Sequence, residues 1–101
     1  MEDRNLYNGL IRLHILHHAA ESPIFGQWMI DELSHHGYRL SAGTLYPILH
    51  GMETQGYLTS RVTKKDGRNR RVYRATPLGR KALVTARKRV QELFGEMFED
   101  D

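Results

Sequence analysis

The sequence contains no cysteine among its 101 residues. It therefore offers no disulfide, iron–sulfur cluster or thiolate zinc site, and it is compatible with a reducing compartment. No segment approaches the roughly 20 apolar residues that a membrane-spanning helix needs. The first ten residues carry acidic side chains and no apolar export signal. We therefore expect a cytoplasmic protein that is neither exported nor embedded in a membrane.

Motifs of catalysis are lacking as well. The sequence has no Gly-x-Ser-x-Gly motif, no glycine-rich phosphate loop and no carboxylate pair assigned to a cleft. A chain of 101 residues has room for one small domain, which excludes two-domain enzyme architectures. We expect a single compact unit that is not an enzyme and requires no cofactor.

Acidic residues are scarce in one part of the chain. Residues 1–60 hold three basic and six acidic residues, residues 61–90 hold twelve basic and one acidic, and residues 91–101 hold five acidic. The net charge of the whole chain is only +3, although residues 61–90 carry a net charge of +11. Such a segment indicates either a polyanionic partner or a solvated basic face, and charge alone favours neither.

Helical spacing of apolar residues predicts two helices near the N-terminus. The first runs from Asn5 to Ala20 and has a broad buried face that includes Leu6 and Leu10. The second runs from about Gly26 to His35.

A third helix is expected to end near Gln55, with Ser41 as its N-cap. Pro47 conflicts with this start, because proline is tolerated in a first turn and costly deeper in a helix. Either the first turn is distorted, or residues 41–44 form a turn and the helix begins near Leu45. We favour the second alternative.

The pattern changes to β-branched and aromatic residues in near alternation from Tyr57 to Thr76. With Asp66-Gly67 between the two runs, this pattern predicts a two-stranded hairpin. Thr76 and Pro77 form an N-cap and first-turn pair that opens a last helix of about 22 residues. The resulting fold class is mainly α with a β-hairpin wing: a winged helix-turn-helix with a long C-terminal helix.

In such a fold the third helix enters the DNA major groove and the hairpin touches the flanking backbone or minor groove. The candidate DNA-binding residues of the third helix lie at its N-terminus or on its expected outer face: Ser41, Thr44, Tyr46, Pro47 and His50. The hydroxyls near its start suit phosphate contacts. The alternatives are that Ser41 only caps the helix and that Tyr46 is a packing residue.

Basic residues cluster around the tip of the hairpin. The candidate DNA contacts there are Lys64, Lys65, Arg68, Arg70 and Arg71. Alternation places Arg71 and Tyr73 on one face of the strand and Arg70 on the other. A solvated loop is the alternative, and the adjacent helix-turn-helix pattern favours DNA contact.

The segment Leu40-Ser41-Ala42-Gly43-Thr44-Leu45-Tyr46-Pro47-Ile48-Leu49 resembles the Gly-Thr-Leu-Tyr-Pro segment of the PadR family of bacterial transcriptional regulators. Met52-Glu53, Gly56-Tyr57-Leu58 and the passage from Arg71 to Gly79 extend the resemblance over nearly the whole chain. The chain differs in having Gly26-Gln27-Trp28 where the family often has Gly-Tyr, and in its short C-terminal region without tryptophan.

The resemblance implies a homodimeric repressor that binds a double-stranded DNA operator and is released by an effector, often a small hydrophobic compound. Residues 1–76 would form the DNA-binding domain, and residues 77–101 a dimerisation helix with an acidic tail. The dimerisation residues fall at a and d spacing or beside it: Leu83, Ala86, Val90, Leu93, Phe94 and Met97. The missing tryptophan argues against an aromatic sandwich as the effector site, and the alternative aromatic, Trp28, is more typical of a core.

One face of the first helix carries candidate ligands of a divalent metal: His14, His17, His18 and Glu21. His14 and His18 have the i, i+4 spacing that lets two imidazoles bind one ion. A polar face or a histidine-lined subunit contact is the simpler interpretation. If a metal binds, its affinity should fall below about pH 6.5, because the ligands must be neutral.

Two alternative functions are also compatible with the sequence. The first is a winged-helix module that binds protein through its last helix and does not bind DNA. The second is a metal-responsive repressor that uses the histidines of the first helix.

Overall fold

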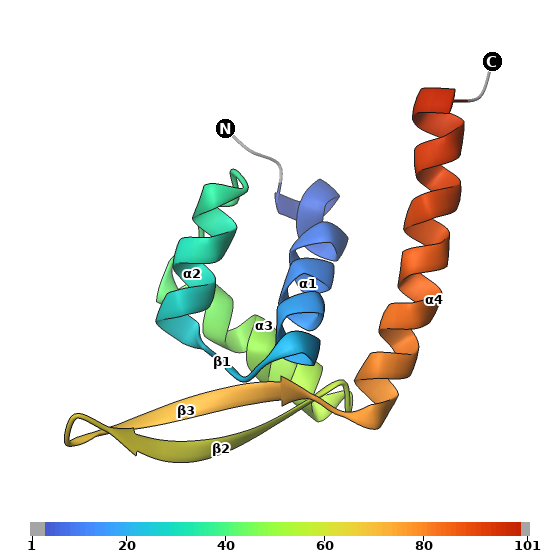
Figure 1. The fold of residues 1–101 in the computed structure, drawn as a ribbon. Helices are drawn as coiled ribbons and strands as arrows, with labels where there is room; N and C mark the ends of the chain where they lie inside the picture. The colour runs from blue at the N-terminus through green and yellow to red at the C-terminus, as the bar shows by residue number, and fades with distance from the viewer. Residues whose placement is uncertain (1–3, 100–101) are drawn as a thin grey trace.

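The computed structural model describes residues 4–99. Three helices, a hairpin and a long last helix follow one another in the expected order (Figure 1). The helices are α1 (Arg4–Glu21), α2 (Gly26–His35), α3 (Ala42–Thr54) and α4 (Pro77–Phe94), and the hairpin strands are β2 (Leu58–Lys65) and β3 (Arg68–Ala75). This arrangement confirms the mainly α fold class with a β-hairpin wing.

A third strand, β1 (Ile24–Phe25), was not predicted. It pairs antiparallel with β3, with Ile24 opposite Tyr73 and Phe25 opposite Val72, so the sheet has the order β1-β3-β2. The expected two-stranded hairpin is therefore part of a three-stranded sheet. Two residues are too few to show alternation, and only the pairing with β3 makes this segment a strand.

The core lies where α1, α2 and α3 meet above the base of the sheet. Its fully buried side chains come from all these elements: Ile11, Ile15, Met29, Leu33, Leu45, Leu49 and Leu58. Met29 of α2 is buried, whereas Trp28 is 40% exposed. The broad buried face expected for the first helix is narrower than predicted, because Leu6 and Leu10 lie exposed on its N-terminal half.

The third helix begins at Ala42, so the predicted start near Leu45 was wrong. Pro47 lies inside the helix and removes only the bond that its N–H would make to the carbonyl of Gly43. Gly43 is exposed at the helix start, where water solvates the freed carbonyl. The helix therefore tolerates this proline near its N-terminus.

The turns predicted around the hairpin are confirmed. Asp66 and Gly67 both have positive φ, 54° and 78°, as a two-residue type I′ turn requires. Thr76 caps α4, because its hydroxyl accepts a 2.9 Å hydrogen bond from the backbone N–H of Gly79. Pro77 occupies the first turn of α4 as predicted.

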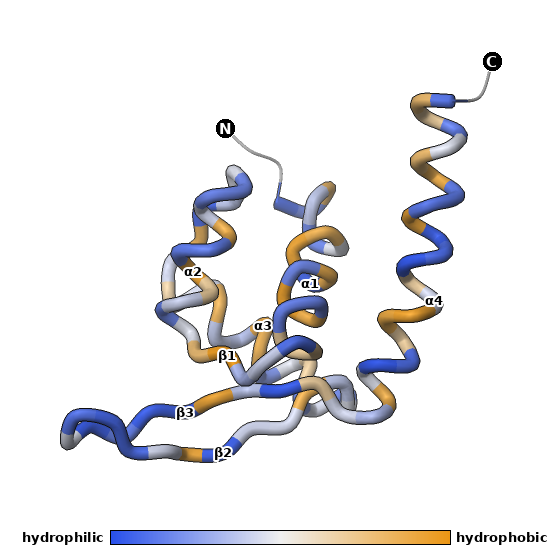
Figure 2. The backbone as a smooth tube through the Cα atoms, in the orientation of Figure 1, coloured by the Kyte–Doolittle hydropathy of each residue, from blue (hydrophilic) through white to orange (hydrophobic). Residues whose placement is uncertain are grey.

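The last helix rises from the base of the sheet beside α1 and extends past the helical body (Figure 1). It continues from α4 into a π-helical turn, η1 (Gly95–Glu99), so the predicted length is confirmed but the last turn is not α-helical. Orange apolar positions recur along it in Figure 2. Residues 100 and 101 of the predicted tail lie outside the described residues. No helix in residues 4–99 is both long and apolar enough to span a membrane.

Candidate DNA-binding surface

The outer face of α3 is solvent-exposed at the positions that the sequence assigns to it. Tyr46 is 43% exposed, and Pro47 and His50 are also exposed. The opposite face packs Leu45 and Leu49 into the core. Since α3 is the second helix of the helix-turn-helix, this exposed face is the one available to the major groove.

The start of α3 presents polar groups that make few hydrogen bonds within the described fold. Ser41 occupies the N-cap position, but its side chain makes no capping bond. Its hydroxyl instead donates to the Thr44 hydroxyl at 3.3 Å, and the Arg4 guanidinium donates to the same oxygen at 3.0 Å. The prediction of Ser41 as the N-cap residue is therefore confirmed, although its side chain forms no capping bond. The Thr44 N–H donates to the Ser41 carbonyl at 3.1 Å, so the N–H groups of the two preceding helix residues are the ones that an anion beside Arg4 could use.

Tyr46 has a packing role that the sequence left open. A Cβ added to Gly26, at the buried start of α2, would collide with the ring and hydroxyl of Tyr46. The absence of a side chain at Gly26 thus makes room for Tyr46 between α2 and α3. The exposed part of its ring is on the surface of the helix, but the hydroxyl end is turned toward α2.

The hairpin extends from the helical body on the side away from α4, and its tip is strongly hydrophilic (Figure 2). Lys64, Lys65 and Arg68 flank the Asp66-Gly67 turn and are all exposed. None of these three cations makes a salt bridge to another described residue. Their charges are therefore free to meet a phosphate backbone.

Arg70 and Arg71 lie on opposite faces of β3, as alternation predicted. The Arg70 guanidinium lies 4.0 Å from the centroid of the Phe25 ring, in a cation–π contact. Arg71 donates a 3.0 Å hydrogen bond to the hydroxyl of Ser60 on β2. Both side chains are thus partly engaged within the fold, and the three cations at the tip are the least restrained.

A hydrogen-bond network joins α3 to the hairpin, and the sequence did not reveal it. One carboxylate oxygen of Glu53, near the end of α3, accepts bonds from the Ser60 hydroxyl at 2.7 Å and the Ser60 N–H at 3.1 Å. Through Ser60 the network reaches Arg71. Glu53 therefore connects the hairpin directly to the third helix, in addition to the packing of the sheet on the core.

Replacing Glu53 by alanine is expected to lower the free energy of unfolding by about 1 to 3 kcal/mol, the usual cost of losing charged hydrogen bonds. Hydrogen exchange of the hairpin amides should accelerate, because the strand loses its connection to α3. Glu53→Gln is the matched control, since its amide oxygen still accepts from Ser60 and the loss should be smaller. Equal amide protection in all three proteins would contradict a positioning role for Glu53.

The four candidate metal ligands of α1 do not form one cluster. Within the described residues, the groups with ligand-like spacing are His14 with His18 and His36, and His17 with His18 and Glu21. Glu32 of α2 also approaches the first group. The sequence missed His36 and Glu32 because they reach this place only through the packing of α2 on α1.

Two titration shifts accompany this arrangement. Partial burial, followed by the nearby His36 and His18 rings, lowers the pKa of His14. The hydrogen bond from His36 is the main cause that lowers the pKa of Glu32. At neutral pH the His14 ring is therefore neutral and the Glu32 side chain is a carboxylate.

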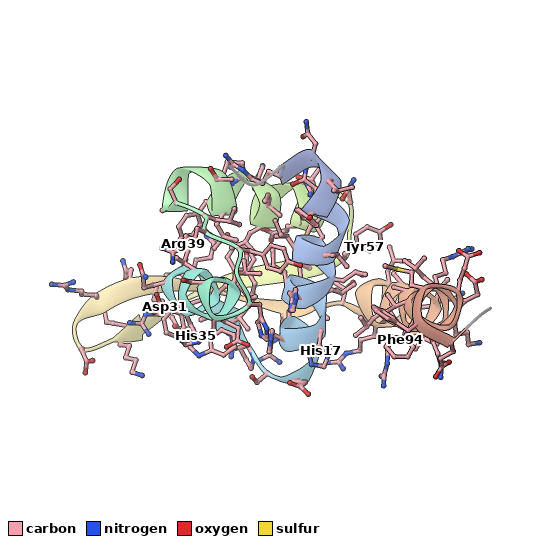
Figure 3. All side chains as sticks on the ribbon, turned by 90° about the horizontal axis from the view of Figure 1, so that it is seen from above. His17, Asp31, His35, Arg39, Tyr57 and Phe94 are labelled. Atoms are coloured by element: carbon pink, nitrogen blue, oxygen red, sulfur yellow. The ribbon has the colours of Figure 1, made fainter. Side chains whose placement is uncertain are left out.

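The predicted dimerisation residues lie on a largely exposed apolar face of the last helix. Val90, Leu93, Phe94 and Met97 are between 46% and 64% exposed, whereas Leu83 and Ala86 are half-buried against α1. Figure 3 shows α1, with His17 labelled, side by side with α4, with Phe94 labelled. An open groove of about 590 Å³ runs between the helices, lined by Leu10, Leu13, His14, His17, Leu83, Ala86, Arg87, Val90, Gln91 and Phe94.

Comparison with known families and curated proteins supports the same fold and function. Residues 15–85, more than half of the chain, match the model of the transcriptional regulator PadR-like family. The chain is 53% identical over 94 residues to the transcriptional regulator Rv3488 of Mycobacterium tuberculosis, covering 93% of this chain and 88% of that protein.

Solved structures have the same architecture. A PadR family transcriptional regulator from Eggerthella lenta superposes with a TM-score of 0.78 at 28% identity, covering 96% of this chain and 88% of that one. The protein smu.1704 from Streptococcus mutans superposes with a TM-score of 0.76 at 29% identity, covering 85% of this chain and 80% of that one.

Proposed function

This chain belongs to the PadR-like family of transcriptional regulators, and from that premise we propose that it is a homodimeric repressor of a near-palindromic operator. As a member of this family it is a DNA-binding regulator and not an enzyme. The observation that carries the proposal is the exposed face of α3 beside a hairpin tip whose three cations form no salt bridge with residues 4–99. We place its action in the cytoplasm, where the DNA of a bacterium lies.

In this proposal each part of the surface has a distinct role. Pro47, His50 and the exposed edge of Tyr46 face the base edges of the major groove. Ser41 and Thr44, together with Arg4 beside them, hold a phosphate at the start of α3. Lys64, Lys65 and Arg68 contact the flanking backbone or minor groove, and Arg70 and Arg71 extend this contact toward the base of the hairpin.

The proposed dimer uses the apolar face of the last helix. Phe94 is 51% exposed, Met97 is 64% exposed and Phe98 is 69% exposed, and such a row of large apolar side chains is unusual on a monomer. Exposed Leu10 on α1 lines the groove beside this face and widens the same apolar surface. A second copy that packs its last helix here would place two α3 helices about one DNA turn apart.

The proposed effector is a small hydrophobic compound, as the family resemblance implies. The groove between α1 and α4 supports this proposal, because it combines an apolar lining with polar groups from His17, Arg87 and Gln91. A ligand bound at the edge of the dimer contact would change the separation of the two α3 helices and release the operator.

A mobility-shift titration tests the proposed function. The probes are duplexes from the DNA that flanks this gene and random duplexes of equal length. We expect an inverted repeat in the flanking DNA to bind at least about a thousandfold tighter than random sequence. Failure to retain the protein on heparin or any DNA at low salt would favour a protein-binding module instead.

A further inference from the structure

Two pairs of side chains with i, i+4 spacing face each other across the contact of α1 and α2. His14 and His18 come from α1, Glu32 comes from α2, and His36 is the C-cap residue directly after α2. We propose that these four side chains bind a divalent transition-metal ion such as Zn²⁺. The proposal concerns the DNA-free protein, so it stands or falls independently of the proposed repressor function.

The spacing of the three histidines suits one metal ion, and Glu32 lies close to two of them. Ligand atoms of His14, His18 and His36 all lie within 4.8 Å of one another. A carboxylate oxygen of Glu32 lies 3.3 Å from Nε2 of His18 and 2.9 Å from Nε2 of His36. Donors of a tetrahedral zinc site are about 3.3 Å apart, given metal–ligand bonds near 2.0 to 2.1 Å. The contacts of Glu32 are already close to this spacing, and side-chain rotations of the histidines would complete the coordination.

The rings around this cluster have restricted orientations. The His14 and His36 rings are stacked with centroids 4.6 Å apart, and the His18 ring packs edge-on against Trp28 at 5.2 Å. Restricting the rings before the metal binds lowers the entropy cost of forming the site. Trp28, which is neither a core residue nor on the expected DNA surface, thus acquires a role in orienting a ligand.

The donor set selects the class of metal. Three imidazoles and one carboxylate suit zinc and its neighbours among the divalent transition metals, whereas calcium and magnesium require sites made mostly of oxygen. An ion held by all four groups would join α1 to α2, the first helix of the helix-turn-helix. Binding is therefore expected to raise the thermal unfolding midpoint by several degrees.

The second group, His17 with His18 and Glu21, is the weaker candidate. Its unshared side chains, His17 and Glu21, are 50% and 64% exposed, against 45% for His36 and 23% for Glu32. All three of its members lie on one helix, so an ion there would connect no other element. The two groups share His18, which means that variants of the unshared residues distinguish them.

Isothermal titration of the chelator-treated, tag-free protein with Zn²⁺ at pH 7.5 tests the proposal. We expect one ion per chain and an increased unfolding midpoint. His36→Ala and Glu32→Gln should each weaken binding at least about tenfold, because each removes a donor. His35→Ala is the matched control, since His35 is an exposed neighbour outside both groups, and its binding should equal that of the wild type.

The outcomes separate the alternatives. Loss of binding in His17→Ala and Glu21→Ala with retention in His36→Ala would assign the ion to the other group and overturn the proposal. Absence of saturable binding by the wild type, or equal binding by wild type, His14→Ala and His36→Ala, would show that the cluster is only a hydrogen-bond network. Circular dichroism of each variant confirms that the fold is retained.

Discussion

Phe94→Asp is expected to convert the proposed dimer to a monomer and to weaken operator binding at least about a hundredfold. Phe94 is half-exposed at the end of the groove between α1 and α4, where a second copy would bury it. A buried, unpaired carboxylate is strongly unfavourable. In a dimer, binding of one half-site raises the effective concentration of the second DNA-binding domain at the other half-site. A monomer loses this gain in affinity. Light scattering after size exclusion measures the mass, and a mobility shift measures the affinity.

Thr85→Asp is the matched control for this prediction. Thr85 is an exposed residue of α4 outside the groove lining, and the substitution adds the same charge. It should leave both mass and affinity close to wild type. A Phe94→Asp protein that keeps the wild-type mass, or a wild type that is monomeric at micromolar concentration, would rule out dimerisation through this face.

Replacing Lys64, Lys65 and Arg68 together by alanine should weaken binding to operator and random DNA alike, by roughly a hundredfold at 0.1 M salt. A plot of the logarithm of the association constant against the logarithm of the salt concentration has a negative slope. Each lost phosphate contact reduces the magnitude of that slope by about 0.9, so the triple variant should reduce it by about 3. His50→Ala, by contrast, should keep the slope and change the sequence preference, because His50 lies on the exposed face of α3. Titrations on both duplexes at several salt concentrations measure these effects.

The basic segment of residues 61–90 continues from the hairpin into α4, so a charge-matched control is available. Replacing Lys81, Lys88 and Arg89 by alanine removes three exposed cations from α4. This variant should lose much less affinity and keep most of the salt slope. Equal losses from the two triple variants would show that net charge, not the hairpin tip, determines DNA affinity.

Elements with a strong local pattern were predicted closely. The hairpin followed from alternation around Asp66-Gly67, because a type I′ turn needs two residues that tolerate positive φ. The start of α4 followed from Thr76 and Pro77, whose capping and fixed φ act within one turn. The start of α3 was misplaced, because a rule for helix interiors was applied to Pro47, close to an exposed helix end.

Contacts between distant segments were not predicted. The pairing of β1 with β3, the bond of Glu53 to Ser60 and the approach of Tyr46 to Gly26 join residues whose separation in sequence carries no periodic signal. The candidate metal cluster is similar: His14 and His18 were visible as an i, i+4 pair, whereas Glu32 and His36 were not.

The amino-acid sequence by itself determined the order of the elements, the basic hairpin tip and the family, because propensity, turn chemistry and charge act over a few neighbouring residues. Only the tertiary structure decided which cations are free, how the hairpin is held against α3 and which histidines meet. Those outcomes depend on how α2 packs on α1 and how β3 pairs with β1, and such packing sums many weak contacts between residues far apart in the chain.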